Sequence, residues 1–227
     1  MEQNAIEIAK LKQRYEPKKL MIKARLKEFE SIMAKGDEAI FEELCFCLFT
    51  AGSSARTGLK SVDAIRDILM TGSAEELAER LKGIHRYGKR RAEYVVLARD
   101  FFQKIPSFPP LKKGGRRDFK LKEIIESYGN NKEALRDFCV RNIKGLGYKE
   151  ASHFLRNIGF KGYAILDRHI LRNLCRWGVT EETTSPSNKK KYLEIEIKMK
   201  DFANEIGIDF DDLDLLFWSN ETGEILK

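Results

Sequence analysis

Residues 143–149 read IKGLGYK, and eighteen residues beyond the final lysine stands Asp167, within the segment AILDRH at 164–169. Gly145 and Gly147 separate two segments with helical periodicity, which predicts a tight turn between two helices. Glycine accepts positive φ and has no Cβ to obstruct a close neighbour. The pattern therefore predicts a helix–hairpin–helix over about 132–158, with the second helix beginning near Tyr148.

The start of that second helix is a candidate phosphate site. Unpaired N–H groups and the helix dipole favour an anion there, and Lys144 and Lys149 add positive charge. Gly145 and Gly147 would let the backbone approach closely. Contacts of this kind hold the backbone of a nucleic acid and do not read its sequence. A G-x-G turn also occurs as an ordinary link between helices, so the prediction depends on the lysine and the aspartate that follow.

Lys149 and Asp167 form a candidate catalytic pair. A neutral lysine amine can attack sugar C1′ and form a Schiff base, and a nearby carboxylate stabilises an oxocarbenium-like transition state. Burial, the positive end of the helix and cationic neighbours such as Lys144, Arg141 or Lys161 would lower the pKa of the amine. Taken singly, Lys149 is an ordinary surface lysine and Asp167 an ordinary N-cap. Their combination with the hairpin favours catalysis.

Composition favours a nucleic-acid partner. The 227-residue chain is 42% apolar and 34% charged, with a net charge of +7 and a pI of about 9.1. Abundant lysine and glutamate weakly indicate a thermophile. No apolar segment is long enough for a signal peptide or a membrane span, so we expect a cytoplasmic, nucleoid-associated protein of a prokaryote.

Four cysteines stand at 45, 47, 139 and 175, none in a C-x-x-C pair. We therefore expect buried free thiols, with no zinc site, no iron–sulfur cluster and no other metal.

Helical periodicity runs through almost the whole chain, so we predict an all-α fold. In the helix over 89–102 the residues expected to face inward are Tyr94, Leu97, Ala98 and Phe101. Apolar and polar residues alternate in part of 189–206, so a strand is possible there, but the length of the segment favours a helix. Residues 73–76 read SAEE, a capping box. Prolines and glycines over 105–117 predict a loop, whose basic cluster at 112–117 we interpret as solvated rather than phosphate-binding. Further predicted helices cover 38–50, 59–70, 119–128, 168–177 and 213–219.

Several stretches together resemble one branch of the endonuclease III superfamily, the type-2 8-oxoguanine DNA glycosylase/lyases of archaea and thermophilic bacteria. They are KEASHFLRN (149–157), ILDRH (165–169), 49–60, 86–94 and 218–227. The resemblance covers most of the chain. Two departures from the superfamily are normal for the branch: Lys144 replaces a proline before the hairpin glycine, and residues 164–166 replace the proline near the aspartate. The cluster ligands of endonuclease III are missing here.

The resemblance implies a two-lobed fold with a DNA cleft between the lobes. One lobe would be a six-helix bundle over 38–160 that ends in the hairpin, and the other would combine 1–37 with 161–227. It also implies a bifunctional enzyme without a cofactor, acting on double-stranded DNA that contains 8-oxoguanine or an abasic site. A monomer is the default expectation and does not come from the resemblance. Lys149 would be the nucleophile that removes the base and then cleaves the strand by β-elimination, and Asp167 the catalytic carboxylate.

In this branch the last residue, here Lys227, is implicated in telling 8-oxoguanine from guanine. Its carboxylate would be a charged acceptor for the N7–H of the lesion. Trp218 is either a core residue or an aromatic face for the flipped base. His169, in the first turn after Asp167, is a candidate contact to the DNA backbone, and His153 is either structural or a second such contact.

Two alternatives stay open from the sequence. The same chemistry could act on another oxidised base, or the chain could be a non-catalytic helix–hairpin–helix module that only binds DNA.

Overall fold

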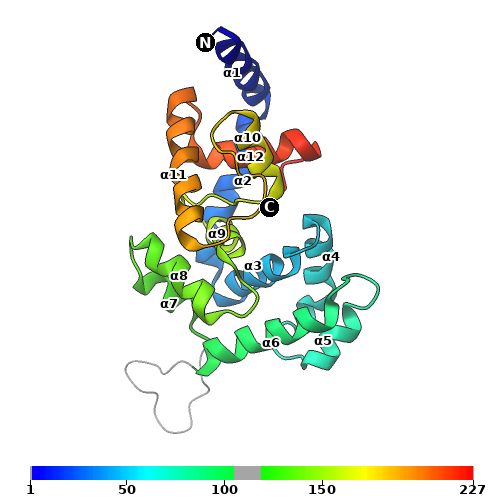
Figure 1. Ribbon diagram of the computed structural model, residues 1–227. Coiled ribbons are helices and arrows are strands. Elements are labelled where there is room, and N and C mark those ends of the chain that lie inside the picture. Colours follow the sequence, from blue (N-terminus) through cyan, green and yellow to red (C-terminus); the bar gives the residue numbers. More distant parts are fainter. Residues whose placement is uncertain (1, 105–118, 227) are drawn as a thin grey trace. The chain divides into compact units, whose positions relative to one another are not determined.

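The computed structural model describes residues 2–104 and 119–226, and all regular secondary structure within these ranges is helical (Figure 1). The prediction of an all-α fold is therefore confirmed. The elements are α1 (Glu2–Tyr15), η1 (Glu16–Lys18), α2 (Lys19–Glu30), η2 (Met33–Lys35), α3 (Asp37–Thr50), α4 (Ala55–Ile65), η3 (Arg66–Ile68), α5 (Ala74–Arg80), α6 (Gly88–Lys104), α7 (Leu121–Ser127), α8 (Lys132–Asn142), α9 (Tyr148–Asn157), α10 (Arg168–Arg176), α11 (Lys189–Ile206) and α12 (Phe210–Thr222).

The chain divides into two compact units. The terminal unit comprises Met1–Glu30 with Leu155–Lys227, and the central unit comprises Ser31–Phe154. Our sequence-based boundaries lay at 37/38 and 160/161, a few residues further along the chain at both places. The second boundary differs because helix α9 runs through it, and no composition signal marks a division inside a helix.

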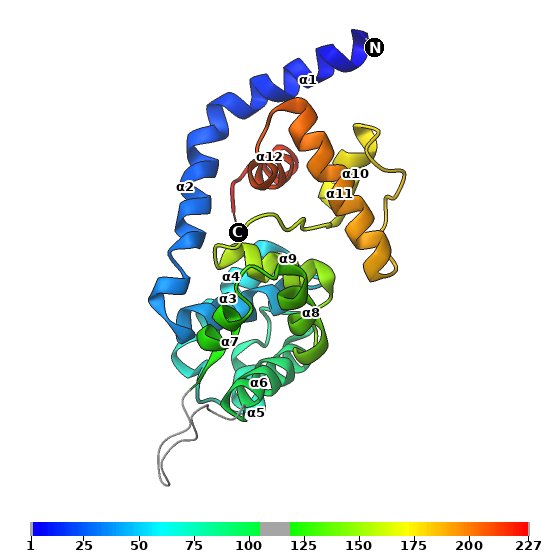
Figure 2. The ribbon, with the colours of Figure 1, turned by 90° about the vertical axis from the view of Figure 1, so that its left-hand side faces the viewer.

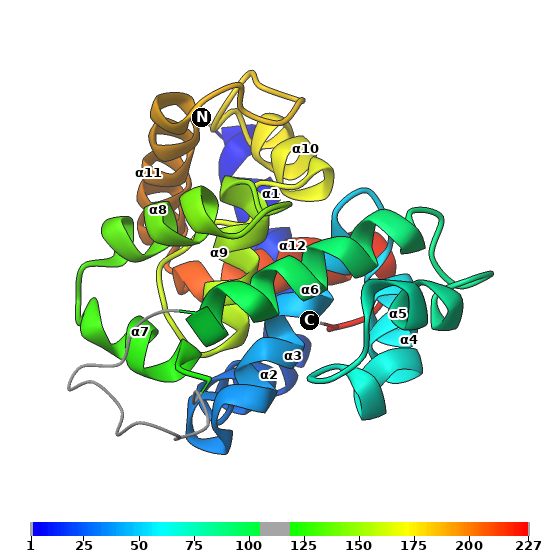
Figure 3. The same ribbon diagram turned by 90° about the horizontal axis from the view of Figure 1, so that it is seen from below.

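In the central unit, α3 forms the core. Every residue from Leu44 to Thr50 is buried, as expected for a helix that is apolar on all sides. Helices α4, α6 and α7 pack against α3, and α5 packs against α6 and α4 (Figure 3). The predicted capping box opens α5, since the Ser73 side chain accepts from the Glu76 N–H and the Glu76 carboxylate accepts from the Ser73 N–H.

The inward face of α6 differs from the prediction. Of the four expected residues only Ala98 is fully buried, and Leu97 is 47% exposed. The reason is Arg99, which is buried because its guanidinium donates to the carbonyls of Leu69 (3.1 Å) and Gly72 (2.8 Å). With Arg99 on the inner face, the stripe of buried residues along α6 lies about one position further along the chain than predicted. The residues buried along it are Gly88, Ala92, Val95, Ala98, Arg99 and Phe102.

In the terminal unit, α12 packs against α2, α10 and α11 (Figures 1 and 2). Its first turns carry three buried carboxylates, and each holds a different segment of the unit. Buried carboxylates are stable only with such partners. The contacts are Asp211 with the Gly162 N–H (2.8 Å), Asp212 with Lys23 (2.9 Å) and the Tyr15 hydroxyl, and Asp214 with Arg156 (3.2 Å).

Three further predictions can be compared with the structure. Residues 189–206 form helix α11, so the strand alternative was wrong. Cys45, Cys47 and Cys139 are buried free thiols, whereas Cys175 is half-buried. In the described ranges, no helix combines the length and the apolar character needed to cross a bilayer. The basic cluster at 112–117 and Lys227 lie outside the described residues.

Candidate functional site

Gly145 forms the turn of the predicted hairpin between α8 and α9. Its φ is +98°, and a Cβ built on it would stand 2.8 Å from Tyr94 Cε2 and 3.2 Å from Leu48 Cδ2. Glycine is therefore required for two reasons, conformation and space. Gly147 differs, because its φ is not positive and a Cβ there would meet only Glu150 Oε2, at 3.2 Å. The expectation of positive φ was right for Gly145 and wrong for Gly147.

Gly147 instead provides the cap of α9. Its N–H donates to Glu150 Oε2 at 3.3 Å, and its carbonyl accepts from the Ala151 N–H at 2.9 Å. Glu150 thus reaches back from the third helical position, which is one half of a capping box. Our sequence reasoning missed Glu150, although a glutamate three residues after the glycine is the signal that would have revealed it.

Lys149 is the second residue of α9, and its side chain is 23% exposed. The charged group beside its Nζ is the carboxylate of Glu150, whose Oε1 lies 3.8 Å away. The structure therefore provides a partly buried amine at the positive end of a helix, with a carboxylate nearby.

Three cations surround the ring of Tyr94, which packs against the hairpin. The charged groups of Arg91, Lys144 and Arg90 lie 5.6, 5.8 and 6.0 Å from the ring centroid. Arg91 also donates to the carbonyl of Ala51 at 2.5 Å, and burial lowers the pKa of its guanidinium. This concentration of positive charge favours binding of an anion. The sequence signal was the pair Arg90–Arg91 one helical turn before Tyr94, which we had not interpreted.

Asp167 is the N-cap of α10, as predicted. Its Oδ1 accepts from the N–H groups of His169 (2.7 Å) and Ile170 (2.8 Å). The side chain is half-buried. Within the described ranges no residue donates a hydrogen bond to Oδ2. One oxygen therefore fixes the side chain and the other remains available for a ligand.

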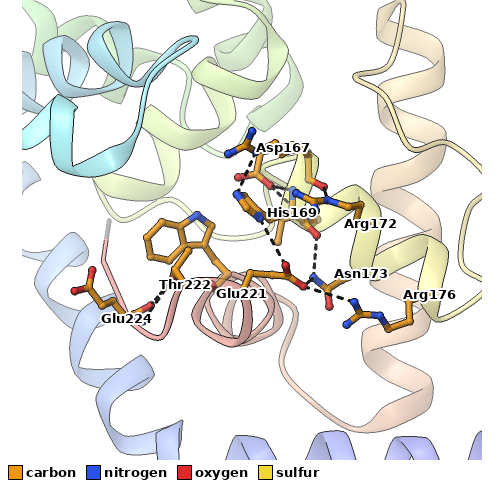
Figure 4. A network of polar contacts seen from close by, with 11 residues as sticks. Asp167, His169, Arg172, Asn173, Arg176, Glu221, Thr222 and Glu224 are labelled. Atoms are coloured by element: carbon orange, nitrogen blue, oxygen red, sulfur yellow. Dashed lines mark hydrogen bonds and ion pairs between the residues drawn. The ribbon is translucent and has the colours of Figure 1, made fainter. Parts of the chain in front are cut away.

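The ring of His169 lies between two charged groups (Figure 4). Its Nδ1 is 3.9 Å from Glu221 Oε2, and Arg168 Nε is 3.3 Å from its Nε2. Glu221 also accepts from Asn173 Nδ2 at 3.3 Å and lies 3.8 Å from Arg176. This carboxylate from the end of α12 therefore holds the face of α10 that carries His169, and sequence spacing gave no signal for it.

The remaining candidates are distributed between the two units. Trp218 is half-buried near the end of α12, and Lys227 lies outside the described residues. His153 is buried edge-on against Phe46 at 5.5 Å, which favours its structural interpretation. His85 is buried and bonds the Phe49 carbonyl at 2.8 Å. Among the described residues, no group of three or more histidines, cysteines and acidic residues could hold a metal ion.

The central unit therefore brings together Lys144, Gly145, Gly147 and Lys149. The terminal unit carries Asp167, His169 and Trp218.

A family model described as 8-oxoguanine DNA glycosylase matches residues 22–208, most of the chain. The chain belongs to this family. The resemblance inferred from the sequence is confirmed by relatives of the same kind. One from Methanocaldococcus jannaschii, named 8-oxoguanine DNA glycosylase/AP lyase, is 43% identical over 208 residues, covering 91% of this chain and 92% of the relative. Another of that name, from Thermotoga petrophila, is 34% identical over 229 residues and covers both chains completely.

Solved glycosylase structures have the same fold. The crystal structure of the M. jannaschii 8-oxoguanine DNA glycosylase matches with a TM-score of 0.84 at 41% identity, covering 99% of this chain and 98% of that one. A second structure of that enzyme, in complex with a 15mer DNA containing 8-oxoguanine, also matches with a TM-score of 0.84, covering 98% of this chain and 100% of that one. The Thermotoga maritima glycosylase matches at 0.83 with 34% identity, over 99% and 100% of the two chains.

Proposed function

We propose that this protein is a bifunctional 8-oxoguanine DNA glycosylase/AP lyase of base-excision repair. The observation that carries the proposal is the partly buried amine of Lys149 at the start of the second hairpin helix. It occurs in a chain whose relatives are named for both activities, glycosylase and lyase. The substrate is double-stranded DNA that contains 8-oxoguanine or an abasic site.

In this proposal Lys149 is the nucleophile. Its neutral amine forms a bond with sugar C1′ while the bond from C1′ to the base breaks, and the base leaves with the electron pair and takes up a proton. The resulting adduct opens to a Schiff base. Loss of a C2′ proton from that Schiff base expels the 3′ phosphate, which cleaves the strand. The position of Lys149 in the first turn of α9, two residues after the hairpin glycine Gly147, supports the proposal.

Asp167 is proposed to stabilise the developing positive charge on the sugar. The transition state resembles an oxocarbenium ion, and a carboxylate held in place beforehand lowers its energy. The two hydrogen bonds to Oδ1 support this role, since they hold the side chain while Oδ2 stays available.

The hairpin is proposed to hold the DNA backbone through Lys144, Gly145 and Gly147. The cation cluster around Tyr94 supports this. His169 is proposed as a further backbone contact from the terminal unit, and its Nδ1 lies 3.9 Å from Glu221 Oε2. We also propose that Trp218 and Lys227 contribute to recognition of the lesion, Trp218 by stacking on the flipped base.

We propose further that the enzyme needs no metal or cofactor, because an amine and a carboxylate together provide the chemistry, and that it acts as a monomer. A prokaryotic cytoplasm, where the nucleoid lies, is its proposed location.

Borohydride trapping on a duplex with a single 8-oxoguanine tests the function. The native chain is expected to give a covalent protein–DNA band, and Lys149→Gln is expected to give none. Lys82→Gln is a matched control, because Lys82 is an exposed lysine of the central unit that already pairs with Glu79 at 3.3 Å.

A native chain that binds the duplex tightly but gives no band would contradict the proposed substrate. Trapping on a duplex with an oxidised pyrimidine would then indicate the same chemistry on another base. No trapping on any lesion or on an abasic site would indicate a binding module.

A further inference from the structure

The segment between α9 and α10 is buried although it has no regular secondary structure. Tyr163, Ala164, Ile165 and Leu166 are each no more than 5% exposed, and none belongs to a helix or strand. Buried backbone N–H and C=O groups need hydrogen-bond partners, and this segment cannot obtain them from a helix or sheet.

Helix α11 provides partners for Ala164 and Leu166 through two side chains. The Tyr192 hydroxyl donates to the Ala164 carbonyl at 2.6 Å and accepts from the Leu166 N–H at 3.3 Å. The Glu196 carboxylate accepts from the Ala164 N–H at 2.9 Å. Tyr192 and Glu196 are four residues apart, so they lie on the same face of the helix.

The segment held in this way ends at Asp167. Leu166, whose N–H binds the Tyr192 hydroxyl, is the residue directly before it, and the Asp167 N–H donates to the Ile165 carbonyl at 2.6 Å. The backbone is therefore held on the entry side of Asp167 by Tyr192. On the exit side the N-cap bonds to α10 hold it.

We propose that Tyr192 is a positioning residue for Asp167, acting through its hydroxyl bridge between the Ala164 carbonyl and the Leu166 N–H. The inference rests on the proposed function, because it assumes that Asp167 takes part in base excision. Tyr192 belongs to the buried apolar stripe of α11, together with Ile195, Met199 and Phe202. The apolar stripe accounts for the burial of the aromatic ring, but it does not account for the burial of the polar hydroxyl.

Tyr192→Phe tests the proposal, because it removes the hydroxyl and keeps the ring. Single-turnover excision of 8-oxoguanine is expected to fall roughly tenfold to a hundredfold, the usual cost of a small misplacement of a reacting group. Duplex affinity and borohydride trapping on a preformed abasic site are expected to stay close to native, because an abasic site has no base to remove.

Tyr15→Phe is the matched control for stability. Tyr15 is also a buried tyrosine of the terminal unit, and its hydroxyl binds Asp212 rather than the segment before Asp167. Its variant is expected to unfold at a lower temperature and to excise 8-oxoguanine at the native rate.

Two further comparisons separate positioning from a general loss of stability. In an Asp167→Asn background, Tyr192→Phe is expected to cause no additional loss of excision, because it acts through Asp167. Glu196→Gln, which keeps an oxygen for the Ala164 N–H, is expected to excise faster than Glu196→Ala.

The inference would be overturned if Tyr192→Phe excised 8-oxoguanine at the native rate, or if Tyr192→Phe lowered excision by the same factor in the Asp167→Asn background as in the native protein. Either result would leave the proposed function intact. A native chain that neither excises 8-oxoguanine nor traps would overturn the function, and the inference with it.

Discussion

The two oxygens of the Asp167 carboxylate have different surroundings. Oδ1 accepts hydrogen bonds from the N–H groups of His169 and Ile170 at the start of α10, while no described residue donates to Oδ2. A carboxylate is an efficient electrostatic catalyst when its orientation is set before the reaction. The N-cap interpretation and the catalytic interpretation are therefore compatible, because capping is what orients the side chain.

Substituting Asp167 separates these two contributions. Asp167→Asn keeps an oxygen that can cap α10 and removes the charge, so excision is expected to fall by orders of magnitude while the unfolding free energy changes little. Asp167→Ala is expected to lose excision and also about 1 kcal/mol of stability, because the cap is gone. Single-turnover excision and urea denaturation measure the two effects. Undiminished excision by Asp167→Asn would contradict the proposed role.

The two hairpin glycines are expected to differ in their tolerance of a side chain. Gly145→Ala places a Cβ in a strained φ and against the ring of Tyr94, so we expect a loss of about 1–3 kcal/mol in unfolding free energy. Gly147→Ala meets only the end of the flexible Glu150 side chain and is expected to cost much less. Thermal unfolding of both variants measures this. Equal losses would show that the turn does not require glycine specifically at Gly145.

At the level of helices, α12 connects the terminal unit through buried carboxylates. One of them, Asp214, pairs with Arg156 from the end of α9 at 3.2 Å. Burial raises the pKa of the Asp214 carboxyl to about 7, the charges of Asp167 and Asp211 raise it further, and Arg156 opposes the change. Because Asp214 is already protonated in part near neutrality, this ion pair depends on pH.

This pKa predicts a pH dependence of stability. The pKa of an unfolded aspartate is about 3.9, so between about pH 4 and pH 7 the folded state binds a proton that the unfolded state has lost. The unfolding free energy should therefore fall as pH rises through that window, with a slope of up to about 1.4 kcal/mol per pH unit from this group. Urea denaturation at pH 5 and pH 7 measures the change, which is expected to be smaller in Asp214→Asn. The same change in both proteins would argue against the raised pKa.

For the whole molecule, the net charge of +7 predicts salt-dependent binding to DNA. Affinity for a duplex should fall steeply with ionic strength, because each phosphate contact releases counterions. Lys144→Ala is expected to weaken binding to all sequences alike and to reduce the slope of log K against log salt by about one. Lys82→Ala, which removes a lysine that pairs with Glu79, is expected to leave the slope unchanged. If the slope of log K against log salt for Lys144→Ala equalled that of the native protein, Lys144 would not be one of the phosphate contacts.

Sequence was sufficient where the physical cause is local. The hairpin glycine Gly145, the cap at Asp167 and the helix over 189–206 were all predicted, and the structure agrees. Capping bonds join residues two or three positions apart, and positive φ is a property of one residue, so a short stretch of chain contains the necessary information. The resemblance of the motifs was likewise sufficient to identify the family.

Only the tertiary structure could show contacts between residues far apart in the chain. The inner position of Arg99 depends on the Leu69 and Gly72 carbonyls, and Tyr192 binds Ala164 across 28 residues. A tyrosine in an apolar stripe fits the helical pattern equally well whether or not its hydroxyl has a partner. Which polar groups need that hydroxyl is decided when the helices pack, because only packing removes the competing water.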